Sequence, residues 1–120
     1  MLAAHHPRRH AKSFKYAAEG ILFVAISQAN FRVHLVSGLL VTILGLLLGI
    51  TKAEWLIVIF LITFVLVLEM INTIFEVVVD HLWQEEHPRA KIIKDVAAGA
   101  VLVSSIGALI IGLIIFLPYF

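Results

Sequence analysis

The sequence contains no cysteine, which excludes disulfide bonds, thiolate nucleophiles and cysteine-ligated zinc. Charged residues are scarce, at 14% of the 120 residues, and the net charge is only +1. So small a net charge gives no reason to expect nucleic acid as a partner. Instead, 62% of the residues are hydrophobic and the mean hydropathy is +1.06. A chain of this composition and length is predicted to be an integral membrane protein with a single domain over residues 1–120.

Three apolar stretches approach or exceed the roughly 20 residues that a helix needs to cross a bilayer. They predict transmembrane helices at about 30–50, 54–81 and 92–118, separated by a tight turn and by a longer polar loop with Pro88 as a breaker. Helices are the expected spanning form, because three segments cannot close a barrel and lipid offers no partner for open backbone groups. The predicted fold class is therefore an all-α membrane protein.

A further helix is expected at about 8–27, ahead of the first span. Phe14, Ala18 and Ile21 recur there at helical spacing, opposite Lys12 and Lys15. This pattern favours an amphipathic helix lying in the membrane interface; the alternative is a cap packed on the helical bundle.

Basic residues predict the orientation. Eight of the nine lysines and arginines precede the first span or lie in the loop between the second and third, and three crossings place both regions on one side. The positive-inside rule then puts the N-terminus and that loop in the cytoplasm.

The second span carries an unexpected polar stripe, formed by Glu69, Asn72, Glu76 and Asp80. Their spacing of three, four and four residues keeps them on one helical face. A charged group near the membrane centre costs about 2.5–3.5 kcal/mol on insertion scales, so such residues are functional by default. The alternative is a structural network in which Lys94 or Arg32 neutralises the carboxylates.

The stripe also suits phosphate chemistry. Several carboxylates on one face repel each other unless cations neutralise them, and oxygen donors of this kind suit Mg²⁺. Basic residues gather at the same rim of the membrane. Carboxylates for a metal, cations for phosphates and one deeper carboxylate for a hydroxyl are the parts of a phosphoryl-transfer site. No P-loop or protein-kinase glycine loop is present.

Five stretches of the sequence, FKYAAEGI, NFRVHL, EWL, LVLEMINTIFEVVVD and HPRAKIIKDVAAGAVLV, resemble the small integral-membrane diacylglycerol kinases of prokaryotes. The resemblance runs from about Ser13 to Pro118, and the spellings NFRVHL and HPRAK are closer to the branch that phosphorylates undecaprenol. It implies an ATP- and Mg²⁺-dependent lipid kinase of the bacterial cytoplasmic (inner) membrane, with its active site on the cytoplasmic side. It also implies a homotrimer with active sites between protomers. The acceptor is expected to be undecaprenol, with diacylglycerol as the alternative.

The resemblance also assigns residues. Glu69 corresponds to the catalytic base at the lipid hydroxyl, Asn72 supports it, and Ala98 lies beside the lipid hydroxyl. Glu76 corresponds to a metal ligand, and the position of a second one is occupied by Gln28, where well-known members carry a glutamate. The residues expected to contact ATP are Arg9, Tyr16, Gln28, Glu76, Asp80, Glu85, Glu86, His87, Lys94 and Asp95.

Some alternatives remain open from the sequence. The stripe could serve a small ion or proton transporter or a membrane assembly subunit, although the third span has no charge to continue a path outward. His34 could contact substrate or cap an interface. The histidine-rich start of the chain (His5, His6 and His10) could bind a transition metal or be attracted to anionic lipid.

Overall fold

The computed structural model describes residues 7–120. Within them the chain forms four α-helices, α1 (Pro7–Ser27), α2 (Ala29–Leu48), α3 (Lys52–Leu82) and α4 (Pro88–Phe116), followed by a 3-10 turn, η2 (Leu117–Tyr119). Helices α2, α3 and α4 are long and apolar enough to cross a membrane. The predicted all-α fold with three candidate spans is confirmed, and the chain is a multi-pass membrane protein. His5 and His6 lie outside the described residues.

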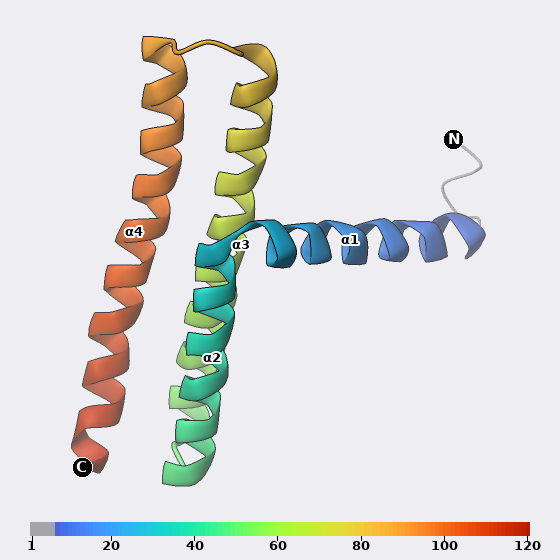
Figure 1. Ribbon diagram of the computed structural model, residues 1–120. Helices are drawn as coiled ribbons and strands as arrows, with labels where there is room; N and C mark the ends of the chain where they lie inside the picture. The colour runs from blue at the N-terminus through green and yellow to red at the C-terminus, as the bar shows by residue number, and fades with distance from the viewer. Residues whose placement is uncertain (1–6) are drawn as a thin grey trace.

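Helix α1 leaves the bundle almost at a right angle to α2 (Figure 1). Gln28 breaks the helix with an extended backbone, at φ −114° and ψ 108°. The Arg32 guanidinium then donates to the carbonyls of Ala25 and Ile26, at 3.0 and 2.7 Å. A cation on the last carbonyls of a helix satisfies acceptors that have no partner within the helix. Arg32 therefore stabilises the elbow between α1 and α2, and within residues 7–120 it forms no ion pair with a carboxylate of the stripe.

Within residues 7–120, most side chains of α1 are exposed and do not pack on the other helices. Phe14 is 80% exposed, and Leu22 and Ile26 are exposed as well. A helix that capped this bundle would bury these side chains. The arrangement favours the interfacial helix over the cap, because large apolar groups pointing away from the protein suit a lipid surface.

The turn between α2 and α3 is fixed by local signals. Gly49 adopts a left-handed backbone (φ 65°), and Thr51 with Glu54 forms a capping box at the start of α3. The hydroxyl of Tyr119 donates to the Glu54 carboxylate, so the C-terminus lies at the same end of the bundle as this turn (Figure 1).

Helices α3 and α4 form an antiparallel hairpin. Helix α4 begins at Pro88, four residues before the expected start at about 92. Proline is favoured in the first turn of a helix because its missing N–H has no intrahelical partner there. The Nδ1 atom of His87 also accepts a bond from the Arg89 amide, at 3.1 Å, and caps the helix. Pro88 thus begins the helix as well as ending the loop.

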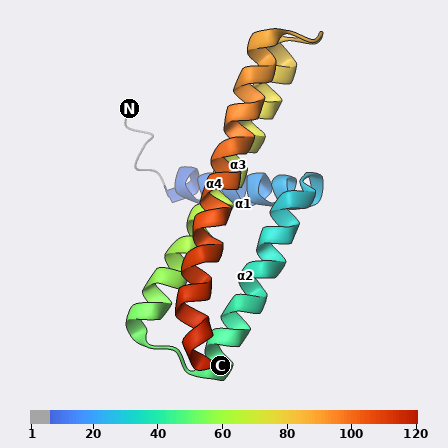
Figure 2. The ribbon, with the colours of Figure 1, turned by 90° about the vertical axis from the view of Figure 1, so that its left-hand side faces the viewer.

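The helices differ in length, and this difference sets the level of the site. At 1.5 Å per residue, the 20 residues of α2 span about 30 Å, which matches the hydrocarbon thickness of a bilayer. The 31 residues of α3 span about 46 Å. The α3–α4 hairpin consequently extends beyond the level of α1 (Figure 2). We call this part, residues 76–94, the hairpin extension.

Candidate active site

Glu69 is the most deeply buried carboxylate among the described residues, with only 3% of its surface exposed. Its Oε1 atom lies 3.3 Å from Nε2 of His34, in the second turn of α2. His34 is five residues below the start of α2, which places the pair about 8 Å below the elbow. The pair therefore sits just inside the level at which α1 leaves the bundle.

His34 is a site residue whose partner could not be identified from the sequence. The contact joins α2 to α3 and depends on how these helices pack, which no spacing within either helix reveals. The available signal was an ionisable residue near the start of an otherwise apolar span, which is rare without a function.

The next two members of the stripe contact each other. The Asn72 amide donates to Oε1 of Glu76 at 3.2 Å, and Glu76 is half-buried. The side-chain amide oxygen of Asn72, Oδ1, is buried without a hydrogen-bond partner. Buried polar atoms are nearly always paired in proteins, so this acceptor is available to a donor or a cation of a ligand.

The fourth member of the stripe, Asp80, belongs to the hairpin extension. Its carboxylate accepts from Lys94 of α4 at 2.8 Å, and one turn earlier in α4 Lys91 pairs with Asp95. The structural network considered from the sequence is thus present at Asp80, at the exposed end of the stripe. It does not extend to Glu69, whose recorded ion pair is with His34.

A cavity of about 820 Å³ lies at the end of the hairpin extension. It combines cationic, anionic and aromatic side chains from α3, the loop and α4. Trp83 lines the cavity and stacks on the His87 ring, with the ring centroids 5.6 Å apart. Six residues expected to contact ATP line the cavity, namely Asp80, Glu85, Glu86, His87, Lys94 and Asp95.

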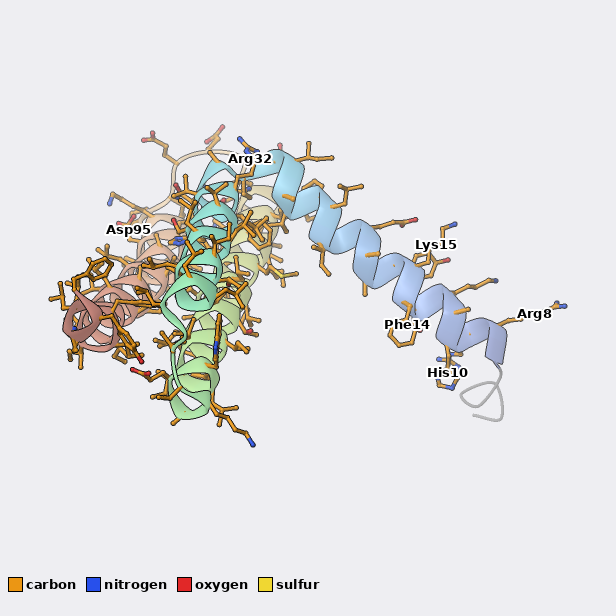
Figure 3. All side chains as sticks on the ribbon, turned by 90° about the horizontal axis from the view of Figure 1, so that it is seen from below. Arg8, His10, Phe14, Lys15, Arg32 and Asp95 are labelled. Atoms are coloured by element: carbon orange, nitrogen blue, oxygen red, sulfur yellow. The ribbon has the colours of Figure 1, made fainter. Side chains whose placement is uncertain are left out.

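The other expected site residues lie elsewhere in this chain. Arg9 and Tyr16 belong to α1, whose labelled Arg8, His10 and Lys15 lie far from Asp95 in Figure 3. Gln28 is half-buried at the elbow, and Ala98 is exposed on α4. A single chain therefore does not gather Arg9 and Tyr16 around the hairpin cavity.

The donor atoms fit Mg²⁺ better than a transition metal. No group of three His, Asp or Glu side chains capable of holding a metal occurs among residues 7–120. The Glu76 carboxylate beside the unpaired Asn72 carbonyl offers neighbouring oxygen donors. Mg²⁺ uses one or two carboxylates and retains waters or phosphate oxygens, so a sparse oxygen site of this kind suits it.

Fold and site together define the class of protein. A buried carboxylate lies near the level of α1, and a polar cavity lies at the projecting end of the same hairpin. The chain is thus a multi-pass membrane protein whose polar residues lead from the edge of the lipid to water.

Comparison with known proteins specifies this class further. Residues 15–116 match the family model described as prokaryotic diacylglycerol kinase. The chain belongs to the prokaryotic diacylglycerol kinase family and is a lipid kinase. Membership of this family excludes the transporter and the assembly subunit as interpretations of the stripe, and it implies the use of ATP.

Three relatives illustrate the range of the family. The chain is 43% identical over 110 residues to an undecaprenol kinase of Bacillus subtilis (strain 168), covering 92% of this chain and 89% of the relative. It is 39% identical over 107 residues to a diacylglycerol kinase of Synechocystis, covering 88% of this chain and 61% of the relative. A diacylglycerol kinase of Escherichia coli (strain K12) is 29% identical over 112 residues, covering 93% and 92%.

Proposed function

We propose that this protein transfers the γ-phosphate of ATP to the hydroxyl of undecaprenol, with Glu69 as the general base. Diacylglycerol is the alternative acceptor. The observation that carries the proposal is the position of Glu69, buried against His34 just below the level of α1. A lipid whose hydrocarbon remains in the bilayer presents its hydroxyl at this level.

The relatives support undecaprenol as the acceptor. The relative named undecaprenol kinase is 43% identical to this chain and covers 92% of it, whereas the E. coli diacylglycerol kinase is 29% identical over a similar length. Both kinds of acceptor present a hydroxyl to the same base, so the stripe itself does not distinguish them.

The proposed reaction is a single phosphoryl transfer. The lipid hydroxyl oxygen attacks the γ-phosphorus of ATP, and its proton passes to the Glu69 carboxylate. The new oxygen–phosphorus bond forms as the bond between the γ-phosphorus and the bridging oxygen of ADP breaks. His34, 3.3 Å from Glu69, acts as a positioning residue that holds the carboxylate towards the acceptor.

Further residues bind the nucleotide in this proposal. The hairpin cavity, with Lys94, Asp95 and His87 in its wall, is about the size of a small-molecule site, since such sites are typically about 300–1,000 Å³. Lys94 supplies a cation for a phosphate, and the ring pair of Trp83 and His87 offers an aromatic surface.

Mg²⁺ is the proposed metal, held by Glu76 with an oxygen from Asn72, and by Gln28 of the elbow. When bound, the metal neutralises phosphate charge. Gln28 contributes a neutral carbonyl instead of a carboxylate, so the affinity of this site for Mg²⁺ is expected to be lower than with glutamate at that position.

The proposed assembly is a homotrimer in which the whole chain forms one lipid-kinase domain. Two observations support it. The apolar side chains of Val77 and Val78 on α3 are exposed in the hairpin extension and need a cover. Arg9 and Tyr16 also need a neighbouring protomer to reach a nucleotide. The proposed orientation has the N-terminus and hairpin extension in the cytoplasm of a bacterial cell, where ATP is available.

The test is a phosphorylation assay on purified protein in lipid bicelles, with radiolabelled ATP, Mg²⁺ and either undecaprenol or diacylglycerol. Glu69→Gln should lower kcat by about 10²–10⁴-fold, the usual contribution of a general base. Glu54→Gln is the matched control, because it removes a carboxylate from the opposite end of α3 while glutamine preserves the capping box. Equal activity of the two variants would refute the role of Glu69, and faster turnover of diacylglycerol would refute the preferred acceptor.

A further inference from the structure

A second, apolar groove is lined by residues of α2, α3 and α4. Figure 2 shows all three helices running below the level of α1. The volume of the groove is about 420 Å³. One end begins at His34, the residue that contacts Glu69, and the wall then follows Gly38 and Leu44 of α2. The groove is therefore continuous with the proposed position of the lipid hydroxyl.

Polarity falls along the groove. The polar side chains in its wall are His34, Ser37 and Ser105. The pairing of Asp80 with Lys94 sets the register of the α3–α4 hairpin, and in this register Ser105 lies level with Glu69. All three polar residues thus lie towards the Glu69 end. The Ser105 hydroxyl donates to the Val101 carbonyl at 2.9 Å, so it offers little to a ligand. Beyond them the wall is hydrocarbon, ending near Phe116.

The dimensions indicate what fits. From His34 to Leu44 the groove follows ten residues of α2, or about 15 Å. A helix of that length with a diameter of about 10 Å occupies about 1,200 Å³, nearly three times the groove volume. The groove cannot enclose a helix of a second protein, whereas its mean cross-section of about 28 Å² suits one extended hydrocarbon chain.

We propose that this groove holds the first part of the tail of a single-chain lipid alcohol, a polyprenol, whose hydroxyl lies at Glu69. This inference rests on the proposed kinase function and specifies its substrate class. A diacylglycerol places two tails side by side below its hydroxyl, and the groove has room for one.

The groove is expected to orient the tail more than to bind it. A tail in the bilayer is already in an apolar solvent, so entering an apolar groove brings no hydrophobic gain. The benefit is a fixed line of approach for the hydroxyl. Blocking the groove should therefore lower kcat/KM for a long polyprenol, since misplacing a reacting group by about 1 Å costs up to about 10²-fold.

Gly112 offers a direct test. It lines the groove, and a Cβ atom built on it meets no other atom within 4 Å. Gly112→Leu therefore adds a side chain to the groove wall at a position where the Cβ atom has room. Gly107→Leu is the matched control, because Gly107 lies on the same helix, is equally unobstructed and does not line the groove.

Both variants are assayed with undecaprenol and with dimethylallyl alcohol, a five-carbon prenol too short to reach Gly112, which lies about 10 Å below the level of Glu69 in the hairpin register. Gly112→Leu should lower kcat/KM for undecaprenol by about tenfold or more and leave dimethylallyl alcohol within about twofold, while Gly107→Leu changes neither. Equal effects of the two variants on undecaprenol would overturn the tail site and leave the kinase intact. If the unmodified protein phosphorylates neither alcohol, it is the proposed function that fails.

A second measurement covers the case in which Gly112→Leu does not fold. The unmodified protein is irradiated with a polyprenol that carries a diazirine near its hydroxyl end, and the labelled peptide is identified by mass spectrometry. Labels that excess undecaprenol prevents support the tail site if they fall on the groove wall, within residues 34–44, 58–65 or 105–116; labels confined to residues outside the wall overturn it. Because the chain has no cysteine, Leu109→Cys also tests for a second copy of the chain in the groove. Disulfide-linked dimers would show that a partner subunit occupies the groove, and would overturn the tail site.

Discussion

Replacing His34 provides a direct test of the contact that organises the base. Its imidazole lies 3.3 Å from a carboxylate that is 3% exposed, so His34→Ala leaves Glu69 without its recorded partner. A hydrogen bond to a charged group contributes about 1.5–3 kcal/mol. Because 1.4 kcal/mol corresponds to a factor of ten, the loss of orientation should lower kcat about 10- to 100-fold.

The assay separates positioning from folding. Initial rates are measured against ATP and against undecaprenol, with circular dichroism and gel filtration as checks of the fold. We expect kcat to fall with KM for ATP unchanged, because His34 is on the lipid side of the site. His34→Gln, which keeps a donor on the side chain, should recover most of the lost rate. If His34→Gln is as impaired as His34→Ala, or if only KM for ATP changes, His34 does not position the base.

The other predictions concern nucleotide binding and stability. Lys94→Met should raise KM for ATP about tenfold, through loss of a charge-assisted phosphate contact, whereas Lys52→Met at the other end of the bundle should not; equal KM values would exclude Lys94 from the nucleotide site. Gly45→Ala should lower the free energy of unfolding by about 1–3 kcal/mol, because a Cβ there lies 2.8 Å from the Trp55 ring. Gly20→Ala meets no atom within 4 Å and should be neutral or stabilising; denaturation in detergent compares the two, and equal stability would contradict the packing argument.

The spans could be predicted from the sequence because lipid imposes a simple rule on composition and length. The polar stripe on α3 could be predicted equally well, since the placing of its four residues on one face depends only on the helical repeat. Contacts between helices were not. The pairing of His34 with Glu69 depends on the packing of α2 on α3, and no pattern within either helix encodes it.

Two local signals were ambiguous for physical reasons. Arg32 was a candidate partner for the carboxylates, but the carbonyls at the end of α1 lie closer along the chain and accept its bonds. Pro88 signals the end of a loop and the first turn of a helix equally well, so the start of α4 was placed too late. In both cases the competing local interaction decided the outcome.

The stripe on α3 has one consequence for how the site tolerates change. Glu69 and Glu76 are seven residues apart, which is close to two full turns of an α-helix. Deleting one residue between them would shorten their separation by only about 1.5 Å, yet it would rotate Glu76 by about 100° around the helix. The register of α3, more than the distance along it, keeps the end that faces lipid and the end that faces water on the same side of the molecule.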